Sequence, residues 1–288
     1  MNLFLLSWNL PKESFSEVIS ELHEMTKIYP QLDPGTIWHW GRGNNLGTAF
    51  AASIHTSEHA AAPRRYVWRT DDQVTFYDGC LVDRKGSLTA NDAESLSLHW
   101  NQLAEALEGQ FIIARLTSKP LSIELLTDFL GIGQAYYLHR DNMWIICNSV
   151  NLILRVSKAT TLDPLGVSLF LSTRAVGDNR TLRRDIRVIP GGQLWRWQIG
   201  TNGPKQHIYY QHGKLAGKRQ EVLTRQASKK LADEMVGLCN SLANSYGELQ
   251  CGLTGGRDSR LLTSLLISGG IPVRYYTEGN PGSADVAI

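Results

Sequence analysis

The residues best suited to do chemistry lie in one short turn near the end of the 288-residue sequence. In the segment CGLTGGRDSRLL, which begins at Cys251, an apolar stretch runs into Gly255 and Gly256 and then into a helical pattern. A glycine-rich turn between a parallel strand and a helix directs backbone N–H groups at one spot, which favours a phosphate. We expect the two glycines to take positive φ, and Thr254 and Ser259 to add hydroxyl donors.

Asp258 is the exceptional member of this turn, because a bare carboxylate repels phosphate. It fits if it binds a Mg²⁺ ion that bridges to the phosphates. The alternative is an ordinary tight turn capped by Asp258 or Ser259, since short glycine motifs are weak signals. No lysine follows the glycines, which excludes a Walker A loop.

The surrounding patterns predict a strand over 248–253, a helix over 258–270 and a parallel strand over 273–277. A long amphipathic helix over 221–246 precedes them, with the apolar stripe Leu223, Ala227, Leu231, Met235, Leu238 and Leu242. Two strands and one crossover are too few for a stable parallel sheet. We therefore expect this second domain to be cut short at residue 288, so that the chain is either a fragment or borrows its missing strands from elsewhere.

Composition and charge argue against several classes of function. Hydrophobic residues make up 42% and charged residues 19%, as in globular proteins with a core. The net charge of +2 is too small to predict a nucleic-acid or membrane-surface partner. The four cysteines have no zinc-site spacing, which favours free thiols in a reducing cytoplasm. No segment approaches the roughly 20 apolar residues of a membrane span.

The first two hundred residues combine strand patterns with two helical patterns. Strands are predicted at 1–10, within 66–82, and at 109–116, 121–131, 134–149 and 191–200. Helices are predicted over 13–29 and 91–109, the second with Asn91 as its cap, Glu94 at the capping-box position and Gly109 at its end. This mixture favours a layered αβ domain over an all-β sandwich.

Two motifs carry a resemblance to a known family. LTGGRDSR resembles the SGGxDS pyrophosphate-binding loop of the ATP pyrophosphatase (PP-loop) superfamily, with Thr254 for the usual serine. YYTEGNPGSADVAI resembles the segment after the second strand in the asparagine synthetase family. The resemblance implies binding of ATP with Mg²⁺, transfer of AMP to a carboxylate, and attack of an amine on the acyl-adenylate to give an amide.

By position, the resemblance assigns ATP-binding roles to Leu253, Thr254, Gly255, Gly256, Asp258, Ser259 and Glu278. The hydroxyls and glycines would cradle the pyrophosphate, Asp258 would bind Mg²⁺, and the backbone around Leu253 and Glu278 would flank the adenosine. Arg257 stands at a variable position of the family motif.

The first domain of that family resembles an N-terminal-nucleophile (Ntn) glutaminase of αββα architecture. Several of its segments have counterparts here in the same order: YDGCLVD with Asp78 for an asparagine, NDAES with Asp92 for the glutamine-contacting aspartate, LEGQF, LLTDFLGIGQAYY and IRVIPGGQLWRW. The nearest counterpart of the family's Arg-His-Arg-Gly-Pro-Asp loop is HWGRGNNLGT, residues 39–48, which we interpret as a plain loop.

Residue 2 departs from the family, because Asn2 replaces the nucleophilic cysteine. A carboxamide is no nucleophile, and loss of the nucleophile costs on the order of a millionfold in rate. We therefore expect a glutaminase fold without glutaminase activity. We interpret Asp92 as a helix-start acid rather than a glutamine ligand.

These patterns predict a glutaminase-like domain over 1–211, a linker over 212–224 and the beginning of a PP-loop α/β synthetase domain over 225–288. The first functional hypothesis is a cytoplasmic, ATP- and Mg²⁺-dependent ligase that joins a small-molecule or peptide carboxylate to ammonia or a substrate amine. Asparagine formation, lasso-peptide or β-lactam cyclisation, and natural-product or polysaccharide tailoring stay open, as does a homodimer. The second hypothesis is a catalytically silent binding or scaffold protein that retains a partial ATP loop.

Overall fold

The computed structural model describes residues 2–44, 47–56, 67–83, 104, 107–198, 201–211 and 224–279. The chain divides into two compact units. The first comprises Met1–Cys80, His99–Glu105 and Gly109–His212, and the second comprises Leu81–Leu98, Ala106–Glu108 and Gly213–Ile288. The domain boundaries given by the sequence, with the linker over 212–224, stay a prediction.

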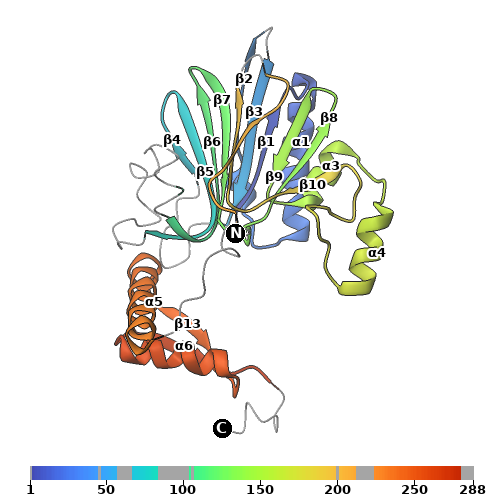
Figure 1. Cartoon of the computed structure of the whole chain (residues 1–288). Coiled ribbons are helices and arrows are strands. Elements are labelled where there is room, and N and C mark those ends of the chain that lie inside the picture. The colour runs from blue at the N-terminus through green and yellow to red at the C-terminus, as the bar shows by residue number, and fades with distance from the viewer. Residues whose placement is uncertain are drawn as a thin grey trace. The chain divides into compact units, whose positions relative to one another are not determined.

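Two six-stranded antiparallel sheets face each other in the first unit (Figure 1). The first sheet contains β1 (Asn2–Trp8), β2 (Trp38–Asn44), β3 (Gly47–His55), β8 (Ala135–Arg140), β9 (Met143–Cys147) and β10 (Ile186–Ile189). The second contains β4 (Val67–Arg69), β5 (Gln73–Asp83), β6 (Leu107–Ser118), β7 (Leu121–Thr127), β11 (Gln193–Gln198) and β12 (Lys205–Ile208). Their strand orders are β10–β8–β9–β1–β3–β2 and β12–β11–β7–β6–β5–β4, so β2 and β4 are both edge strands.

Strand β1 is buried on both faces, as its continuous apolar sequence predicts. Phe4 and Leu6 point into the core between the sheets, whereas Leu3 and Leu5 point into a second core under helices α1 (Phe15–Ile28) and α3 (Val150–Ser157). In Figure 1 the two helices lie against the outer face of the first sheet. Because each fully buried Leu or Phe contributes about 1.5–3 kcal/mol, these two cores hold the layers together. The predicted layered α+β fold is confirmed.

The helical predictions for the first unit have mixed outcomes. The helix over 13–29 is confirmed as α1, which follows the short 3₁₀ helix η1 (Lys12–Ser14). The structure also contains η2 (Pro34–Thr36) and helix α4 (Pro164–Thr173). The helix over 91–109 lies mostly outside the described residues, and so do Asn91, Asp92 and Glu94. Its predicted end is wrong, because Gly109 lies inside β6 with φ +124°, a conformation that glycine alone adopts easily.

The predicted loop over 39–48 is also wrong, because its first residues belong to β2, which pairs with β3 in an antiparallel hairpin. The alanine-rich β3 has weak strand propensity of its own, but it is buried between β1 and β2. Gly41 has a packing role in this hairpin. A Cβ atom at Gly41 would lie 2.8 Å from the Phe15 ring, which stacks on Phe50 at a centroid distance of 4.3 Å.

The turn after β7 is organised by one fully buried carboxylate. Asp128 Oδ1 accepts hydrogen bonds from the backbone N–H groups of Leu130 (3.0 Å) and Ile132 (3.1 Å). Its Oδ2 accepts from Gly133 (2.6 Å) and Phe111 (3.4 Å). The strand predicted over 121–131 therefore ends at Thr127, because the following N–H groups bond to Asp128 instead of to a neighbouring strand.

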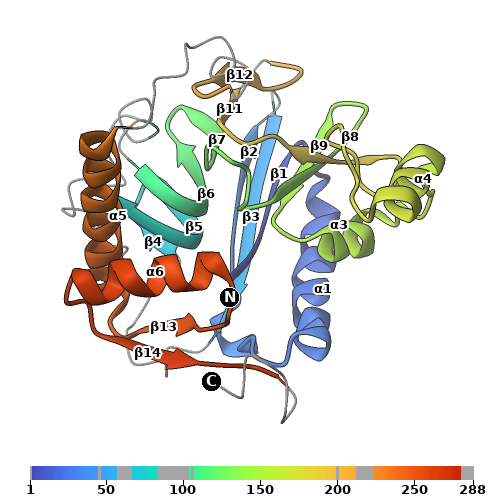
Figure 2. The same cartoon turned by 60° about the horizontal axis from the view of Figure 1, so that its bottom comes forward.

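The second unit contains helix α5 (Arg225–Tyr246), strand β13 (Leu249–Gly252), helix α6 (Arg257–Ser268) and strand β14 (Val273–Tyr276). The two strands pair in parallel, with Leu249 opposite Val273, which confirms the predicted βαβ unit. Figure 2 shows the strands side by side and α6 alongside them. Their small core contains Cys251, Leu266 and Ile271.

The apolar stripe predicted for α5 is wrong by one residue along the helix. Leu231 and Leu238 of that stripe are 53% and 38% exposed, and Leu223 lies outside the described residues. Val236, Cys239 and Ala243 pack against the core instead. Both stripes are apolar, and the sequence pattern alone does not distinguish which of them the strands contact.

None of the helices in the described part of the chain combines the length and the hydropathy that a membrane crossing requires. The four cysteines are free thiols, with Cys147 and Cys251 buried and Cys80 and Cys239 half-buried.

Candidate functional site

The glycine turn lies between the carboxyl end of β13 and the first residue of α6, as the sequence predicts. Gly256 is the N-cap residue and has φ −66°, so the positive φ predicted for it is wrong. A glycine at this position instead leaves room for the Thr254 side chain. A Cβ atom at Gly256 would lie 3.1 Å from the Thr254 hydroxyl oxygen, closer than almost all real Cβ contacts.

The two hydroxyl side chains of the turn meet each other. Thr254 Oγ1 lies 2.9 Å from Ser259 Oγ and accepts a hydrogen bond from the Gly256 N–H at 3.2 Å. Ser259 Oγ donates to the backbone carbonyl of Thr254 at 3.0 Å. The turn and the first turn of α6 are thereby held together by side chains predicted to contact a pyrophosphate.

The N-cap residue of α6 is Gly256, which has no side chain that could cap the helix. Neither Asp258 nor Ser259 is therefore the N-cap residue, and the alternative of an ordinary tight turn stays a prediction. The first N–H groups of any helix have no partner within the helix, and they lie at the positive end of its dipole. The arrangement can therefore receive an anion at the carboxyl end of a parallel strand.

The two predicted adenosine-flanking positions lie at the same edge of the parallel pair. Leu253 follows β13 and donates its N–H to the Tyr276 carbonyl at 2.8 Å. Thr277, which directly follows β14, donates its hydroxyl to the Leu253 carbonyl at 2.8 Å. Glu278 is the next residue and is exposed. Thr277 was not among the predicted site residues, although the sequence shows a hydroxyl at the predicted end of the strand.

Asp258 is exposed in the first turn of α6, beside the exposed Arg257. Within the described ranges, no group of three His, Cys, Asp or Glu side chains comes together as a metal cluster. One carboxylate next to hydroxyl oxygens still fits Mg²⁺, because this ion is commonly bound through one or two carboxylates together with substrate phosphates. The roles of the predicted nucleotide-site residues stay predictions.

Residue 2, where the resembled family has its nucleophile, is well defined in the first unit. Asn2 begins β1 and is fully buried. Its Nδ2 donates to the Tyr77 carbonyl of β5 at 3.0 Å, which connects the two sheets. Its Oδ1 is buried and has no hydrogen-bond partner among the described residues. The side chain therefore serves as a polar connection rather than as a reactive group.

Asn148 completes this polar connection, and the sequence analysis missed it. Its Nδ2 donates to the Asn2 carbonyl at 2.6 Å and to Asp78 Oδ2 at 2.9 Å. Its Oδ1 accepts from the Phe4 N–H at 3.0 Å. We call Asn2, Asp78 and Asn148 the polar seal. An asparagine directly after strand β9 looks like a turn residue, and only its contacts reveal this role.

Cys147 is the thiol next to the polar seal, and it does not replace the missing nucleophile. Burial raises the pKa of Cys147 to about 12, more than the hydrogen bonds from the backbone of Ser149 and Asn148 lower it. The thiol is therefore protonated at neutral pH, and a protonated buried thiol is a poor nucleophile.

Burial raises the pKa of Asp78 above its ordinary value, although the hydrogen bond from Asn148 partly offsets this effect. The contribution of such a group to stability is present below the unfolded-state pKa and is lost as the pH rises through the folded-state pKa. We therefore expect Asp78→Asn to stabilise the protein by about 1 kcal/mol at neutral pH. The difference should disappear below about pH 4, the ordinary range of an aspartate.

Urea unfolding of both proteins across this pH range measures the difference, and Asp185→Asn, at an exposed site, serves as the control. A difference that does not change with pH, or a less stable Asp78→Asn at neutral pH, would contradict the prediction.

No protein-family model and no curated protein matches this chain. Similar solved structures include the glutamine phosphoribosylpyrophosphate (PRPP) amidotransferase from B. subtilis in complex with ADP and GMP. That match has 10% identity and a TM-score of 0.43, and covers 96% of this chain and 65% of the other. A second similar structure is described as the allosteric regulatory enzyme of purine biosynthesis. It has 9% identity and a TM-score of 0.42, and the match covers 100% of this chain and 69% of the other. This chain thus spans less than two thirds of the first protein's length.

Proposed function

We propose that the second unit binds the pyrophosphate part of Mg-ATP at the amino terminus of α6, and that the protein is an ATP-dependent ligase that forms amide bonds. The observation that carries the proposal is the amino terminus of α6, which follows a parallel strand through the glycine turn and adjoins the Thr254–Ser259 hydroxyl pair. The nucleotide and the reaction come from the resemblance of LTGGRDSR to the PP-loop motif.

In the proposed reaction, a carboxylate oxygen of the substrate attacks the α-phosphorus of ATP and pyrophosphate leaves. An amine then attacks the acyl carbon of the mixed anhydride, loses a proton, and AMP leaves with the C–O electron pair. The chain's part is positioning and charge stabilisation. The α6 N–H groups would bind the departing pyrophosphate, and a Mg²⁺ ion held by Asp258 would supply Lewis-acid neutralisation of its charge.

We propose that the nitrogen comes from ammonia or from an amine of the substrate rather than from glutamine. Asn2 stands in place of a nucleophile and is committed to Tyr77, and Asp78 stands where the family's asparagine would be. The carboxylate stays open between aspartate, a peptide side chain, a β-lactam precursor and other natural-product acids. Cytoplasmic location and a homodimer belong to the same proposal.

Binding of Mg-ATP and of Mg-pyrophosphate to the full chain, measured by calorimetry, tests the nucleotide site without knowledge of the carboxylate. We expect saturable binding of both, competition between them, and loss of affinity by about tenfold or more in Thr254→Val and Ser259→Ala, which remove the hydroxyls. Ser264→Ala is the matched control, because its hydroxyl bonds the Arg260 carbonyl within the same helix. Release of pyrophosphate with candidate acids and ammonium then tests the reaction.

The second candidate is a catalytically silent binding or scaffold protein. The observation that favours it is that the hydroxyls of Thr254 and Ser259 already bond each other and the backbone. Absence of binding by both Mg-ATP and Mg-pyrophosphate would favour this candidate over the ligase.

A further inference from the structure

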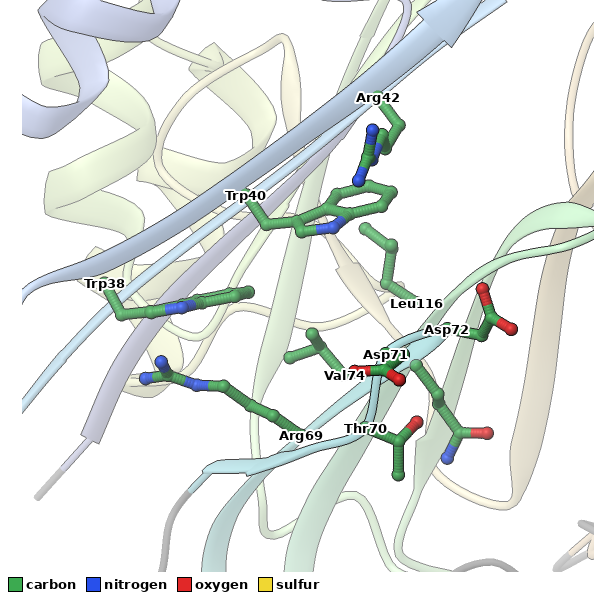
Figure 3. Close-up of a pocket in the computed structure, with 10 residues that line it drawn as sticks. Trp38, Trp40, Arg42, Arg69, Thr70, Asp71, Asp72, Val74 and Leu116 are labelled. Carbon is green, nitrogen blue, oxygen red and sulfur yellow. The ribbon is translucent and has the colours of Figure 1, made fainter.

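A cleft with a cavity volume of about 230 Å³ lies in the first unit, between the edge strands of the two sheets (Figure 3). Strand β2 supplies Trp38, Trp40 and Arg42, and β6 supplies Leu116. The opposite wall is the segment from Arg69 to Val74, which connects β4 to β5. The sequence predicted a loop over residues 39–48, which include most of β2, and the cleft was not predicted.

The interior of the cleft is apolar and partly aromatic. Trp38 and Trp40 stand two residues apart on one strand, so both side chains project from the same face. Both are half-buried and pack against the core between the sheets, of which Val74 and Leu116 are buried members. In Figure 3 the two indoles extend toward these aliphatic side chains. Such walls suit a flat ring, because indole faces favour offset-stacked or edge-to-face contacts.

The rim of the cleft carries the cations Arg42 and Arg69 together with the carboxylates Asp71 and Asp72. The guanidinium carbon of Arg69 lies 4.5 Å from the centroid of the Trp38 ring, and burial lowers the pKa of Arg69. Within the described residues, Arg69 forms no ion pair, whereas Ser118, Lys119 and the charge of Arg42 together lower the pKa of Asp72. Asp72 is already occupied, since it accepts from Ser118 at 2.8 Å and lies 3.3 Å from Lys119 Nζ.

We propose that this cleft binds a small carboxylate built on one flat ring, of the benzoate type. The ring would lie against Trp38 and Trp40 and above Val74 and Leu116, with its carboxylate paired to Arg69. An arginine that stacks on an indole keeps the edge of its guanidinium free, and this edge binds carboxylates through two parallel hydrogen bonds.

The size and polarity of the cleft support this class of ligand. An apolar cavity of about 150 Å³ is large enough to bind benzene, so about 230 Å³ has room for one such ring and a carboxylate. A sugar acid would bring hydroxyls against Val74 and Leu116, where they would lose hydration without compensation. The cleft belongs wholly to the first unit and does not depend on the proposed nucleotide site.

Titration of the full chain with sodium benzoate, followed by ligand-observed NMR, tests the proposal. We expect a Kd on the order of 1 mM or lower, as a ligand of this size allows. Benzyl alcohol lacks the charge, acetate lacks the ring, and glucuronate replaces the flat ring with a sugar, so each should bind at least about tenfold more weakly. Equal binding of benzoate and benzyl alcohol, tighter binding of glucuronate, or no saturable binding of benzoate would overturn the proposal.

Variants separate the cleft from the rest of the surface. Arg69→Gln should weaken benzoate binding by about tenfold and leave the binding of benzyl alcohol unchanged, and Trp40→Leu should weaken both. Arg184→Gln is the matched control, since Arg184 is exposed and outside the cleft. Thermal unfolding confirms that each variant is folded. If Trp40→Leu does not fold, Arg69→Lys replaces it, because a lysine keeps the positive charge but lacks the planar guanidinium. Equal affinities of Arg69→Gln and Arg184→Gln for benzoate would refute the role of Arg69.

Discussion

Asp258→Asn is expected to lower Mg²⁺-dependent pyrophosphate release by about 100-fold or more, because it removes the only carboxylate proposed to hold the metal in this turn. Affinity for Mg-ATP should fall as well, while any Mg²⁺-independent binding of ATP should persist. The fold should be almost unaffected, since Asp258 is exposed and its interaction with the α6 dipole is worth about 0.3–1 kcal/mol. Calorimetry with and without Mg²⁺ and a coupled pyrophosphate assay measure these effects.

Arg257→Gln provides the control for this experiment. Arg257 is the neighbouring exposed residue in the same helical turn, and its position varies in the motif that LTGGRDSR resembles. We expect its variant to keep activity within about threefold of the original chain, as expected for a charge in solvent. Equal pyrophosphate release by Asp258→Asn and Arg257→Gln would rule out Asp258 as the metal ligand.

Asp128→Ala is expected to have the largest effect on stability, a loss of about 3 kcal/mol or more in the free energy of unfolding. The side chain is fully buried and accepts four backbone hydrogen bonds, from residues 111, 130, 132 and 133. Each buried donor left without an acceptor costs about 1–3 kcal/mol, and water that enters the turn would offset part of the sum. Urea unfolding of the full chain measures the change.

Two further variants test whether the carboxylate itself is responsible. Asp128→Asn keeps one acceptor oxygen and should lose about half as much stability. Asp185→Ala removes an exposed carboxylate that lies 3.7 Å from Arg140, and should change stability by at most about 0.5 kcal/mol. If Asp128→Ala were no more damaging than Asp185→Ala, the four hydrogen bonds would not organise this turn.

The sequence predicts the glycine turn well because its information is local. Two glycines, a hydroxyl on each side and the switch from strand to helix pattern all lie within residues 253–260, and the parallel pairing of β13 with β14 follows from the helix between them. The apolar stripe by which α5 packs cannot be determined from local sequence. Two apolar stripes are available on that helix, and contacts with residues far along the chain decide that Val236 and Cys239 pack inward.

The polar seal and the cleft between β2 and β4 could not be predicted because both depend on contacts between distant segments. Asn148 meets Asp78 across 70 positions of sequence, and Trp38 meets Arg69 only because two edge strands approach each other. The β2–β3 hairpin was not predicted, because the alanine-rich sequence of β3 has weak strand propensity. Burial between neighbouring strands, rather than local preference, makes this segment a strand.

The polar seal also restricts how the first unit can change over evolution. A cysteine at position 2 would replace the amide donor that Asn2 gives to the Tyr77 carbonyl with a weaker thiol donor. Its thiolate would also lie near Asp78, a carboxylate that repels negative charge. The contact of Asn2 with Tyr77 and that of Asn148 with Asp78 therefore limit which side chains positions 2 and 148 accept.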